Sequence, residues 1–375
     1  MIKIPLNKPY LDRKEIAAVT KVLKSGKLGA DYSYSRTLIN QLKQYLKTKI
    51  VYLTPSCTSA MELALRVLKF DQGGEVIVPS FTMTSTANVI LTCGLNPRFV
   101  EIEKSNLSID PVDLEKRINK KTRAIMLVHY GGRVGEIEKI KKIAKAHNLF
   151  IIEDAACALG TFYNGISAGN LGDFGAFSFH ETKNLVCGEG GCLTTNRASY
   201  QDKIDIIRDH GTNRTLVLKG VASSYVWQEW GGSFLLSDVL AAIMSQQMEK
   251  VNYITKKRKQ IALNYLKRLS ELQPKIELAS DTPWTNWHTF YFLVPQKKRD
   301  KFLNYARSNG VGAAFHYLPL HDSPMGRKLG YKKGQFSITE QVAYSLVRIP
   351  IYPGLTDKEQ EKVIEVIKKA VKKVL

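Results

Sequence analysis

The sequence lacks any long hydrophobic run and any paired cysteine motif. No apolar stretch in its 375 residues approaches the roughly 20 residues that span a bilayer. The first residues, MIKIPLNKPYLDRKE, are charged almost at once and do not resemble a signal peptide. The five cysteines are odd in number and scattered without a C-x-x-C pair, which argues against a disulfide framework or a zinc site. We therefore expect a soluble cytoplasmic protein with no metal site and no membrane association.

Acidic residues are scarce relative to basic ones. The chain has 34 Asp and Glu against 55 Lys and Arg, for a formal net charge of +21. Such a charge can neutralise nucleic-acid phosphates, or it can belong to a lysine-rich surface that attracts small anionic substrates. The lysines are spread along the chain, and no nucleic-acid module or series of stacking aromatics accompanies them. We favour the second interpretation and expect no nucleic-acid partner.

Short apolar, β-branched runs alternate with helical patterns through the first two thirds of the chain. Strand candidates are EVIVP (75–79), PRFVEIE (97–103), RAIMLVHY (123–130) and LFIIEDAA (149–156). Strands that are buried as continuous apolar runs and joined by helices predict a mostly parallel sheet covered on both faces. The fold class is therefore α/β.

Helix-forming patterns and a change in sequence pattern after about residue 245 indicate how the chain is divided into domains. EIEKIKKIAKAHN carries Ile137, Ile140 and Ile143 at helical spacing, and Asp110-Pro111 reads as an N-cap followed by proline at the first helical position. After about residue 245 a long basic helical pattern leads into a mixed region, and the last helix opens with a capping box at Thr356. We predict a large domain over residues 1–245 and a smaller C-terminal α/β domain over residues 246–375.

The segment DFGAFSFHETKNLVCGEGGCLTTN (173–196) places Lys183 just beyond a buried strand. It predicts a strand, a polar turn, a glycine-rich loop and a second strand. Partial shielding from water would lower the pKa of the Lys183 amine and make it usable as a nucleophile or base. The alternative is a surface lysine in a hairpin turn. A zinc-protease motif starting at His180 is excluded, because Asn184 stands where the second histidine is needed.

Two further segments place polar groups where α/β sheets bind ligands. Asp154 stands at the carboxyl end of a predicted parallel strand, where ligand crevices lie. Its carboxylate could hold a pyridinium nitrogen protonated, or it could cap a helix. The small polar residues 56–59 precede a helix rich in Ala and Leu. A helix N-terminus with hydroxyl groups can bind a phosphate, although Ser and Thr are also ordinary caps.

Taken together, these segments resemble the sugar-nucleotide aminotransferases of the DegT/StrS family, which have the fold-type I aminotransferase architecture and use pyridoxal phosphate. The resemblance covers nearly the whole chain in order, through NKPY, SGKLGAD, TPSCTSA, PSFTMTSTAN, HYGG, EDAA, FSFHETKN, GEGG, HGTNR, LSD, FHYLPLH and RIPIYPGL. Within the family, the HETKN turn and TPSCT loop look most like the branch that makes dTDP-4-amino-4,6-dideoxygalactose. The resemblance implies that residues 1–245 bind the cofactor.

The resemblance also implies roles for single residues. Lys183 would be the catalytic residue, carrying pyridoxal 5′-phosphate (with pyridoxamine 5′-phosphate as its intermediate form) and moving the proton in each half-reaction. Asp154 would pair with the pyridinium nitrogen. The phosphate would be held by Ser56, Cys57, Thr58 and Ser178, with Ser233 from the neighbouring subunit. Contacts to the sugar and its pyrophosphate would come from Asn213 and Arg214 of the partner subunit and from His316, Tyr317 and His321.

Two positions depart from the family pattern. Met83 stands where an aromatic ring usually covers the cofactor, so that thioether contact would replace it, or Phe81 would shift inward. Cys157 stands where Gln or His usually lies near the cofactor hydroxyl. We expect both residues to contact the cofactor and to alter its affinity or absorbance.

The resemblance implies transfer of an amino group from L-glutamate to a keto carbon, most favourably carbon 4, of a dTDP-4-keto-6-deoxyhexose, for O-antigen or other surface-polysaccharide synthesis. A homodimer would share its active sites. Open alternatives are a carbon-3 or UDP-sugar aminotransferase and a non-catalytic basic binding protein. Family dehydratases replace the lysine with histidine, so Lys183 argues against that activity.

Overall fold

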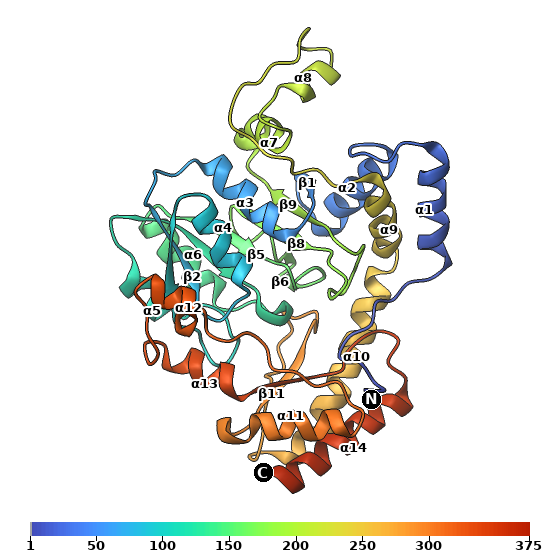
Figure 1. The fold of residues 1–375 in the computed structure, drawn as a ribbon, viewed down its shortest axis with the longest axis vertical. Helices are drawn as coiled ribbons and strands as arrows, with labels where there is room; N and C mark the ends of the chain where they lie inside the picture. Colours follow the sequence, from blue (N-terminus) through green and yellow to red (C-terminus); the bar gives the residue numbers. More distant parts are fainter. Residues whose placement is uncertain (1) are drawn as a thin grey trace.

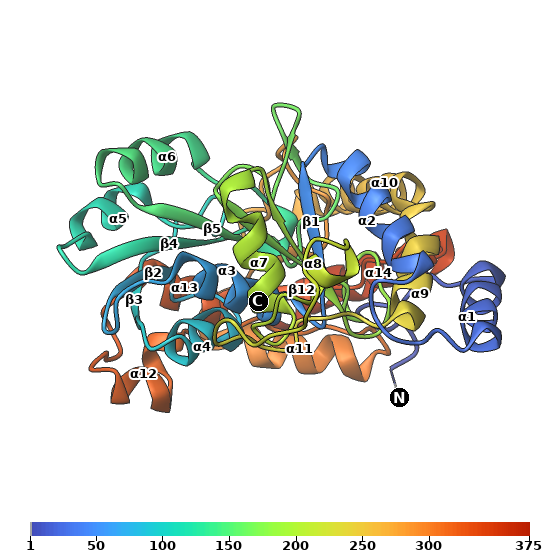
Figure 2. The ribbon, with the colours of Figure 1, turned by 90° about the horizontal axis from the view of Figure 1, so that it is seen from above.

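The computed structural model describes residues 2–375 and is built around a seven-stranded sheet with helices on both faces (Figures 1 and 2). The neighbouring pairs from β8 through β5, β4 and β2 to β3 are parallel, whereas β9 runs antiparallel to both β8 and β1. The predicted mostly parallel mixed sheet is confirmed. In spatial order its strands are β1 (Ile50–Thr54), β9 (Gly191–Thr195), β8 (Phe174–Ser178), β5 (Phe150–Asp154), β4 (Thr122–Val128), β2 (Glu75–Pro79) and β3 (Asn96–Val100).

The four strands predicted from apolar runs are all present. β2 has the predicted bounds, and the other three begin within one residue of them but end two or three residues earlier. The missing residues form the loops at the carboxyl edge of the sheet, where the chain must turn into helices. The strand predictions are therefore confirmed in place and type.

The helices of the large part follow the expected alternation with strands. Asp110 caps α5 by accepting a hydrogen bond from the Val112 N–H at 2.8 Å, as the sequence predicts. The helices are α1 (Arg13–Ser25), α2 (Ser33–Leu46), α3 (Cys57–Leu68), α4 (Thr84–Thr92), α5 (Pro111–Arg117), α6 (Ile137–Ala146), α7 (Gln201–Arg208), α8 (Arg214–Leu218) and α9 (Asp238–Met248). A short hairpin joins β6 (Phe162–Tyr163) to β7 (Ile166–Ser167).

The C-terminal part has its own antiparallel sheet, ordered β10-β11-β12, with α11 and α14 beside it (Figure 1). Thr356 and Glu359 form the predicted capping box of α14, and the apolar stripe of that helix packs into the core of this part. The elements are α10 (Val251–Leu269), β10 (Glu277–Leu278), β11 (Phe290–Leu293), α11 (Arg299–Ser308), α12 (Pro324–Lys328), α13 (Ser337–Ser345), β12 (Leu346–Ile349) and α14 (Asp357–Val374). Single 3-10 turns occur at Tyr130–Gly132, Ala198–Tyr200, Ser270–Leu272, Gln296–Lys298 and Leu320–Asp322.

The chain passes from the core of the large sheet to the core of the small sheet within α10. Ile254 of α10 packs with the large sheet, whereas Ile261 of the same helix packs with the small sheet. Ile4 also joins the small-sheet core, because the N-terminal residues pair with residues 310–312. The boundary at residue 245 lies inside α9, and the division into two domains stays a prediction.

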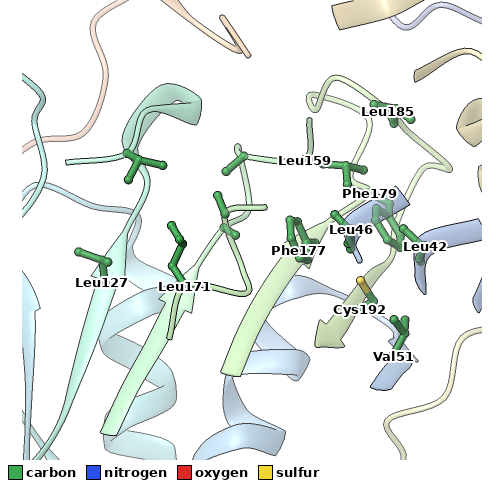
Figure 3. Close-up of a cluster of buried hydrophobic side chains, with 14 of the residues drawn as sticks. Leu42, Leu46, Val51, Leu127, Leu159, Leu171, Phe177, Phe179, Leu185 and Cys192 are labelled. Atoms are coloured by element: carbon green, nitrogen blue, oxygen red, sulfur yellow. The ribbon is translucent and has the colours of Figure 1, made fainter. Parts of the chain in front are cut away.

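The large sheet is buried on both faces, as its continuous apolar strands require. Phe177 of β8 lies in one core with Leu42 and Leu46 of α2 (Figure 3), and Ala176 lies in the core on the other face. This packing fixes the strand ends at which Asp154 and Ser178 stand. None of the helices within residues 2–375 combines the length and apolar character needed to cross a membrane.

Candidate active site

A cavity of about 610 Å³ opens at the carboxyl edge of the large sheet and is lined by residues of both parts of the chain. This is the edge at which parallel sheets bind their ligands. The predicted site residues that line the cavity are Ser56, Cys57, Thr58, Met83, Asp154, Cys157, Ser178, Lys183, His316 and Tyr317. Segments more than 250 residues apart in the sequence therefore meet here, as the family resemblance implies.

Asp154 ends β5 with its side chain directed to the cavity side of the sheet. Its carboxylate accepts hydrogen bonds from the Thr86 hydroxyl at 2.8 Å and from the Ala156 N–H at 3.1 Å. The preceding Glu153 points to the opposite face, where it accepts from Gly169 and Gly172 N–H groups and contacts His129. Because successive strand side chains point to opposite faces, Glu153 and Asp154 lie on different sides of the sheet. Asp154 is the one that a ligand in the cavity can reach.

Lys183 lies in the polar turn between β8 and β9, and its Nζ donates to the Cys157 sulfur at 3.3 Å. Burial by itself would lower the pKa of this amine. The neighbouring Cys157 and Asp154 outweigh that effect, so the pKa of Lys183 is raised above its usual 10.5. The predicted lowering of this pKa is therefore wrong for the free amine, although Lys183 does line the cavity.

The serine-rich loop after β1 forms the N-terminus of α3. The Ser56 hydroxyl caps this helix by accepting from the Ser59 N–H at 3.0 Å, and Thr58 and Ser178 also line the cavity. Burial and the nearby Asp154 raise the pKa of the Cys57 thiol well above its usual range, so this thiol stays neutral. Cys57 donates to the Ala176 carbonyl at 3.3 Å. Free N–H groups and hydroxyls at the start of a helix suit a phosphate.

The last glycine of the glycine-rich loop, Gly191, lies against the N-terminus of α3. A Cβ atom at Gly191 would lie 2.6 Å from the Cys57 nitrogen and 2.4 Å from the Phe177 carbonyl oxygen. Strand β9 passes so close behind the start of α3 that only glycine fits. Gly191 therefore lets β9 support the helix end that forms part of the cavity wall.

An aromatic group forms another wall. The Tyr130 hydroxyl and His316 Nδ1 lie 2.8 Å apart, and the His316 and Tyr317 rings stack with centroids 3.8 Å apart. Burial, together with Arg348 and Lys183, lowers the pKa of His316 well below its usual value, so its ring is neutral. Met83 is half exposed and lines the cavity, whereas Phe81 is fully buried behind it. Of the two options for the missing aromatic cover, the structure favours Met83.

Four predicted substrate or cofactor residues lie outside this cavity. His321 is fully buried, between the Ser80 hydroxyl at 2.7 Å and the Glu340 carboxylate at 2.9 Å, so its predicted sugar contact is not supported. Asn213 uses its amide within its own segment, donating to the Ser224 carbonyl and accepting from the Val226 N–H. Arg214 pairs with Asp209 at 3.0 Å, and Ser233 is exposed.

Several site residues were missed by sequence reasoning. Thr86 holds Asp154 from α4, and Arg258, His288 and Arg348 line the cavity from the C-terminal part. Arg258 carried a usable signal, because it interrupts the apolar stripe of α10 at a core-facing position. The other contacts join distant segments, and the sequence pattern gives no sign of them.

The cavity residues fit pyridoxal 5′-phosphate. A carboxylate for the ring nitrogen, an amine for the aldehyde and a hydroxyl-lined helix N-terminus for the phosphate face one space of suitable size. Within residues 2–375 no group of three His, Cys, Asp or Glu side chains is arranged to hold a metal ion.

Comparisons with known proteins agree with this geometry. Residues 9–368 match the model of the DegT/DnrJ/EryC1/StrS aminotransferase family. The chain is 30% identical to a GDP-perosamine synthase of Vibrio cholerae, over 97% of this chain and 98% of that protein. It superposes with a TM-score of 0.92 and 26% identity on a putative sugar aminotransferase, Spr1654, of Streptococcus pneumoniae in its PMP form, covering all of both chains. PseC of Helicobacter pylori, an aminotransferase involved in pseudoaminic acid biosynthesis, gives the same TM-score and identity over 98% of this chain and 99% of that one.

The family match over nearly the whole chain, the shared fold and the convergence of Lys183 and Asp154 on one cavity lead to one conclusion. The chain belongs to the DegT/DnrJ/EryC1/StrS aminotransferase family and is a transaminase that uses pyridoxal 5′-phosphate.

Proposed function

We propose that this enzyme transfers the amino group of L-glutamate to the keto carbon of a nucleotide-linked deoxysugar, most favourably carbon 4 of a dTDP-4-keto-6-deoxyhexose. The product would enter O-antigen or other surface-polysaccharide synthesis. The observation that carries the proposal is the convergence of the Lys183 amine and the Asp154 carboxylate on one cavity. Similar proteins named for sugar chemistry, including the GDP-perosamine synthase, support a sugar as the acceptor.

The residues of the cavity divide the work of a transaminase. When bound, pyridoxal phosphate supplies the electron-withdrawing ring that acidifies the carbon next to the transferred nitrogen. Asp154, held by Thr86, would keep the ring nitrogen protonated, and the start of α3 with Ser178 would bind the phosphate. Lys183 would remove the proton from the donor carbon and later return a proton to the sugar carbon. His316 and Tyr317 would pack against the sugar.

The proposal includes a homodimer with shared active sites. Residues 209–233, here called the arm, include α8 and project from the body of the molecule (Figure 1). Large apolar side chains on the arm are exposed, among them Leu218, Val221, Trp227 and Trp230. Exposed apolar surface of this extent is typical of a subunit interface. A second copy would cover it and bring Arg214 and Ser233 to the neighbouring cavity.

The test is a coupled conversion with a defined product. Purified enzyme, loaded with pyridoxal phosphate, is incubated with L-glutamate and dTDP-4-keto-6-deoxyglucose, and the product is identified by NMR. We expect 2-oxoglutarate and one 4-amino-4,6-dideoxyhexose, whose configuration NMR defines. An amine at carbon 3, or turnover only with a UDP-linked sugar, would replace the acceptor assignment while leaving the transaminase intact.

Two variants serve as controls for the chemistry. Lys183→Ala should lose turnover and the visible absorbance of the lysine-bound cofactor, because among residues 2–375 no other side-chain amine lines the cavity. Lys183→Arg keeps the positive charge and should be equally inactive. Full turnover in Lys183→Ala, or a colourless wild-type protein that binds DNA with steep salt dependence, would reject the enzymatic proposal.

A further inference from the structure

Two arginines of the C-terminal part line the cavity without an acidic partner. Within residues 2–375, neither Arg258 nor Arg348 has a carboxylate within 4.0 Å. Outside the cavity, the buried Arg208 and Arg299 pair with Asp31 and Asp300. Arg133, which is also buried outside the cavity, has no carboxylate within 4.0 Å in residues 2–375 and lies over the Trp287 ring instead. Removing a charge from water costs several kcal/mol unless a partner compensates it. Two unpaired guanidinium groups in one cavity therefore suggest an anion that is not part of the chain.

Arg258 is the more deeply placed of the two. Its side chain is only 1% exposed and extends from α10 to the cavity. Nε donates to the Trp287 carbonyl at 3.2 Å and Nη2 to the His288 carbonyl at 2.6 Å. Nη1 has no hydrogen-bond partner in the part of the chain that the structure describes. The two carbonyl contacts fix the plane of the guanidinium group and leave one donor edge for a ligand.

Arg348 reaches the same cavity from β12. Its Nη2 donates to the Phe315 carbonyl at 3.0 Å, while its Nε is buried without a hydrogen-bond partner. A buried donor left without a partner costs about 1–3 kcal/mol. Arg348 therefore has both an uncompensated charge and an unsatisfied donor, and an oxygen-rich anion would satisfy both.

The neighbouring groups do not neutralise these cations. His288 lies beside them with its Nδ1 2.9 Å from the Asn184 side-chain oxygen. Burial, with Lys183 and Arg258 nearby, lowers the pKa of His288 well below its usual value, so the ring is neutral. Burial also lowers the pKa of Arg258 to about 9, which leaves it charged at neutral pH. Of the acids that line the cavity, Asp154 faces Lys183, and Glu189 is largely exposed to solvent.

We propose that Arg258 and Arg348 form the subsite that binds the carboxylates of the amino-acid donor. The inference rests on the proposed function and names the residues that recognise its donor. An amino acid carries its α-carboxylate one bond from the carbon that must meet Lys183, so a cation close to that amine suits it. A nucleotide sugar carries its diphosphate on the far side of the sugar ring from the keto carbon. The planar guanidinium donors match a carboxylate in bidentate geometry.

The test separates the two half-reactions of the loaded enzyme. Bleaching by L-glutamate and the return reaction of the aminated enzyme with dTDP-4-keto-6-deoxyglucose are measured separately for Arg258→Lys and Arg348→Gln. We expect kcat/KM for L-glutamate to fall roughly 100-fold in each variant, while the sugar half-reaction changes by less than about threefold. Arg299→Lys, a buried arginine outside the cavity, is the matched control and should leave both rates unchanged.

A binding measurement keeps the inference testable if a variant is kinetically disturbed. Glutarate, a dicarboxylate without an amino group, should bind the loaded wild-type enzyme in calorimetry and bind each arginine variant roughly 100-fold more weakly. Arg348 is only half-buried, so Arg348→Gln serves if Arg258 variants do not fold.

The two half-reactions distinguish a wrong assignment of the arginines from a wrong sugar acceptor. A loss confined to the sugar half-reaction would assign the arginines to the diphosphate and overturn the inference. Equal losses in both half-reactions with unchanged glutarate binding would overturn it as well, as would a wild-type enzyme that neither reacts with L-glutamate nor binds glutarate. A wild-type enzyme that reacts with L-glutamate but aminates no nucleotide sugar would instead reject the proposed acceptor, and glutamate rates with glutarate binding would still decide the arginine assignment.

Discussion

The Thr86 hydroxyl donates to the Asp154 carboxylate at 2.8 Å and is itself fully buried. Thr86→Val preserves shape but removes this donor, so Asp154 is held less firmly under the cofactor ring. We expect the Kd for pyridoxal phosphate to rise roughly tenfold, the scale of a lost hydrogen bond to a charged group. Absorbance titration of apo-enzyme measures it. Thr92→Val, an exposed change at the end of the same helix, should leave the Kd unaltered, and equal values for both variants would contradict the role of Thr86.

The pKa of Lys183 predicts how the apo-enzyme takes up its cofactor. Only the neutral amine adds to an aldehyde, and a pKa above 10.5 keeps most of the amine protonated near neutrality. The rate of cofactor loading should therefore rise as the pH is raised from 6.5 to 9.5, a test range of about 3 pH units. Cys157→Ser removes the acidic neighbour at 3.3 Å, lowers the pKa of Lys183 and should shift this profile to lower pH. Superimposable profiles in stopped-flow absorbance would refute this account of the lysine.

At the scale of elements, the contact between β9 and the start of α3 predicts a strong effect of one methyl group. In Gly191→Ala the new Cβ would lie 2.4–2.6 Å from backbone atoms. This clash is relieved only if β9 or the start of α3 moves. We expect a loss of about 1–3 kcal/mol in unfolding free energy and weaker binding of pyridoxal phosphate, because the helix end that receives the phosphate shifts. Denaturant unfolding and cofactor titration measure the two effects. Gly354→Ala, which meets no atom within 4 Å, is the control, and equal behaviour of the two variants would show that this contact is unimportant.

The elements themselves were largely predictable because their signals are local. The apolar run at 75–79, the cap at Asp110 and the capping box at Thr356 each depend on neighbouring residues, and each is confirmed. The rule that ligands bind at the carboxyl edge of a parallel sheet also placed Asp154 in the cavity. Contacts between distant segments were not predictable in this way. The bond from Thr86 to Asp154 and the burial of His321 against Glu340 depend on how whole elements pack.

At the scale of the whole molecule, the proposed sharing of active sites between two subunits predicts complementation between inactive variants. Lys183→Ala lacks the catalytic amine, and Arg214→Ala lacks a group that the proposed dimer brings to the neighbouring cavity. A mixed dimer of these two variants has one site with both residues intact, so it should recover activity that neither parent shows. Assays after co-expression and separation by two different affinity tags measure this. An inactive mixed dimer would place Arg214 and Lys183 in the same site of one subunit, and a monomeric protein would reject sharing altogether.

The two exposed tryptophans of this chain both lie on the arm, so tryptophan fluorescence reports on the surroundings of the arm. Trp227 and Trp230 are 77% and 68% exposed, whereas Trp287 is buried and Trp284 partly so. Indole emission moves to shorter wavelength when the ring leaves water. If a second copy covers the arm, dilution of the native enzyme shifts its fluorescence to the red in step with dissociation, and the affinity between subunits becomes measurable without any label.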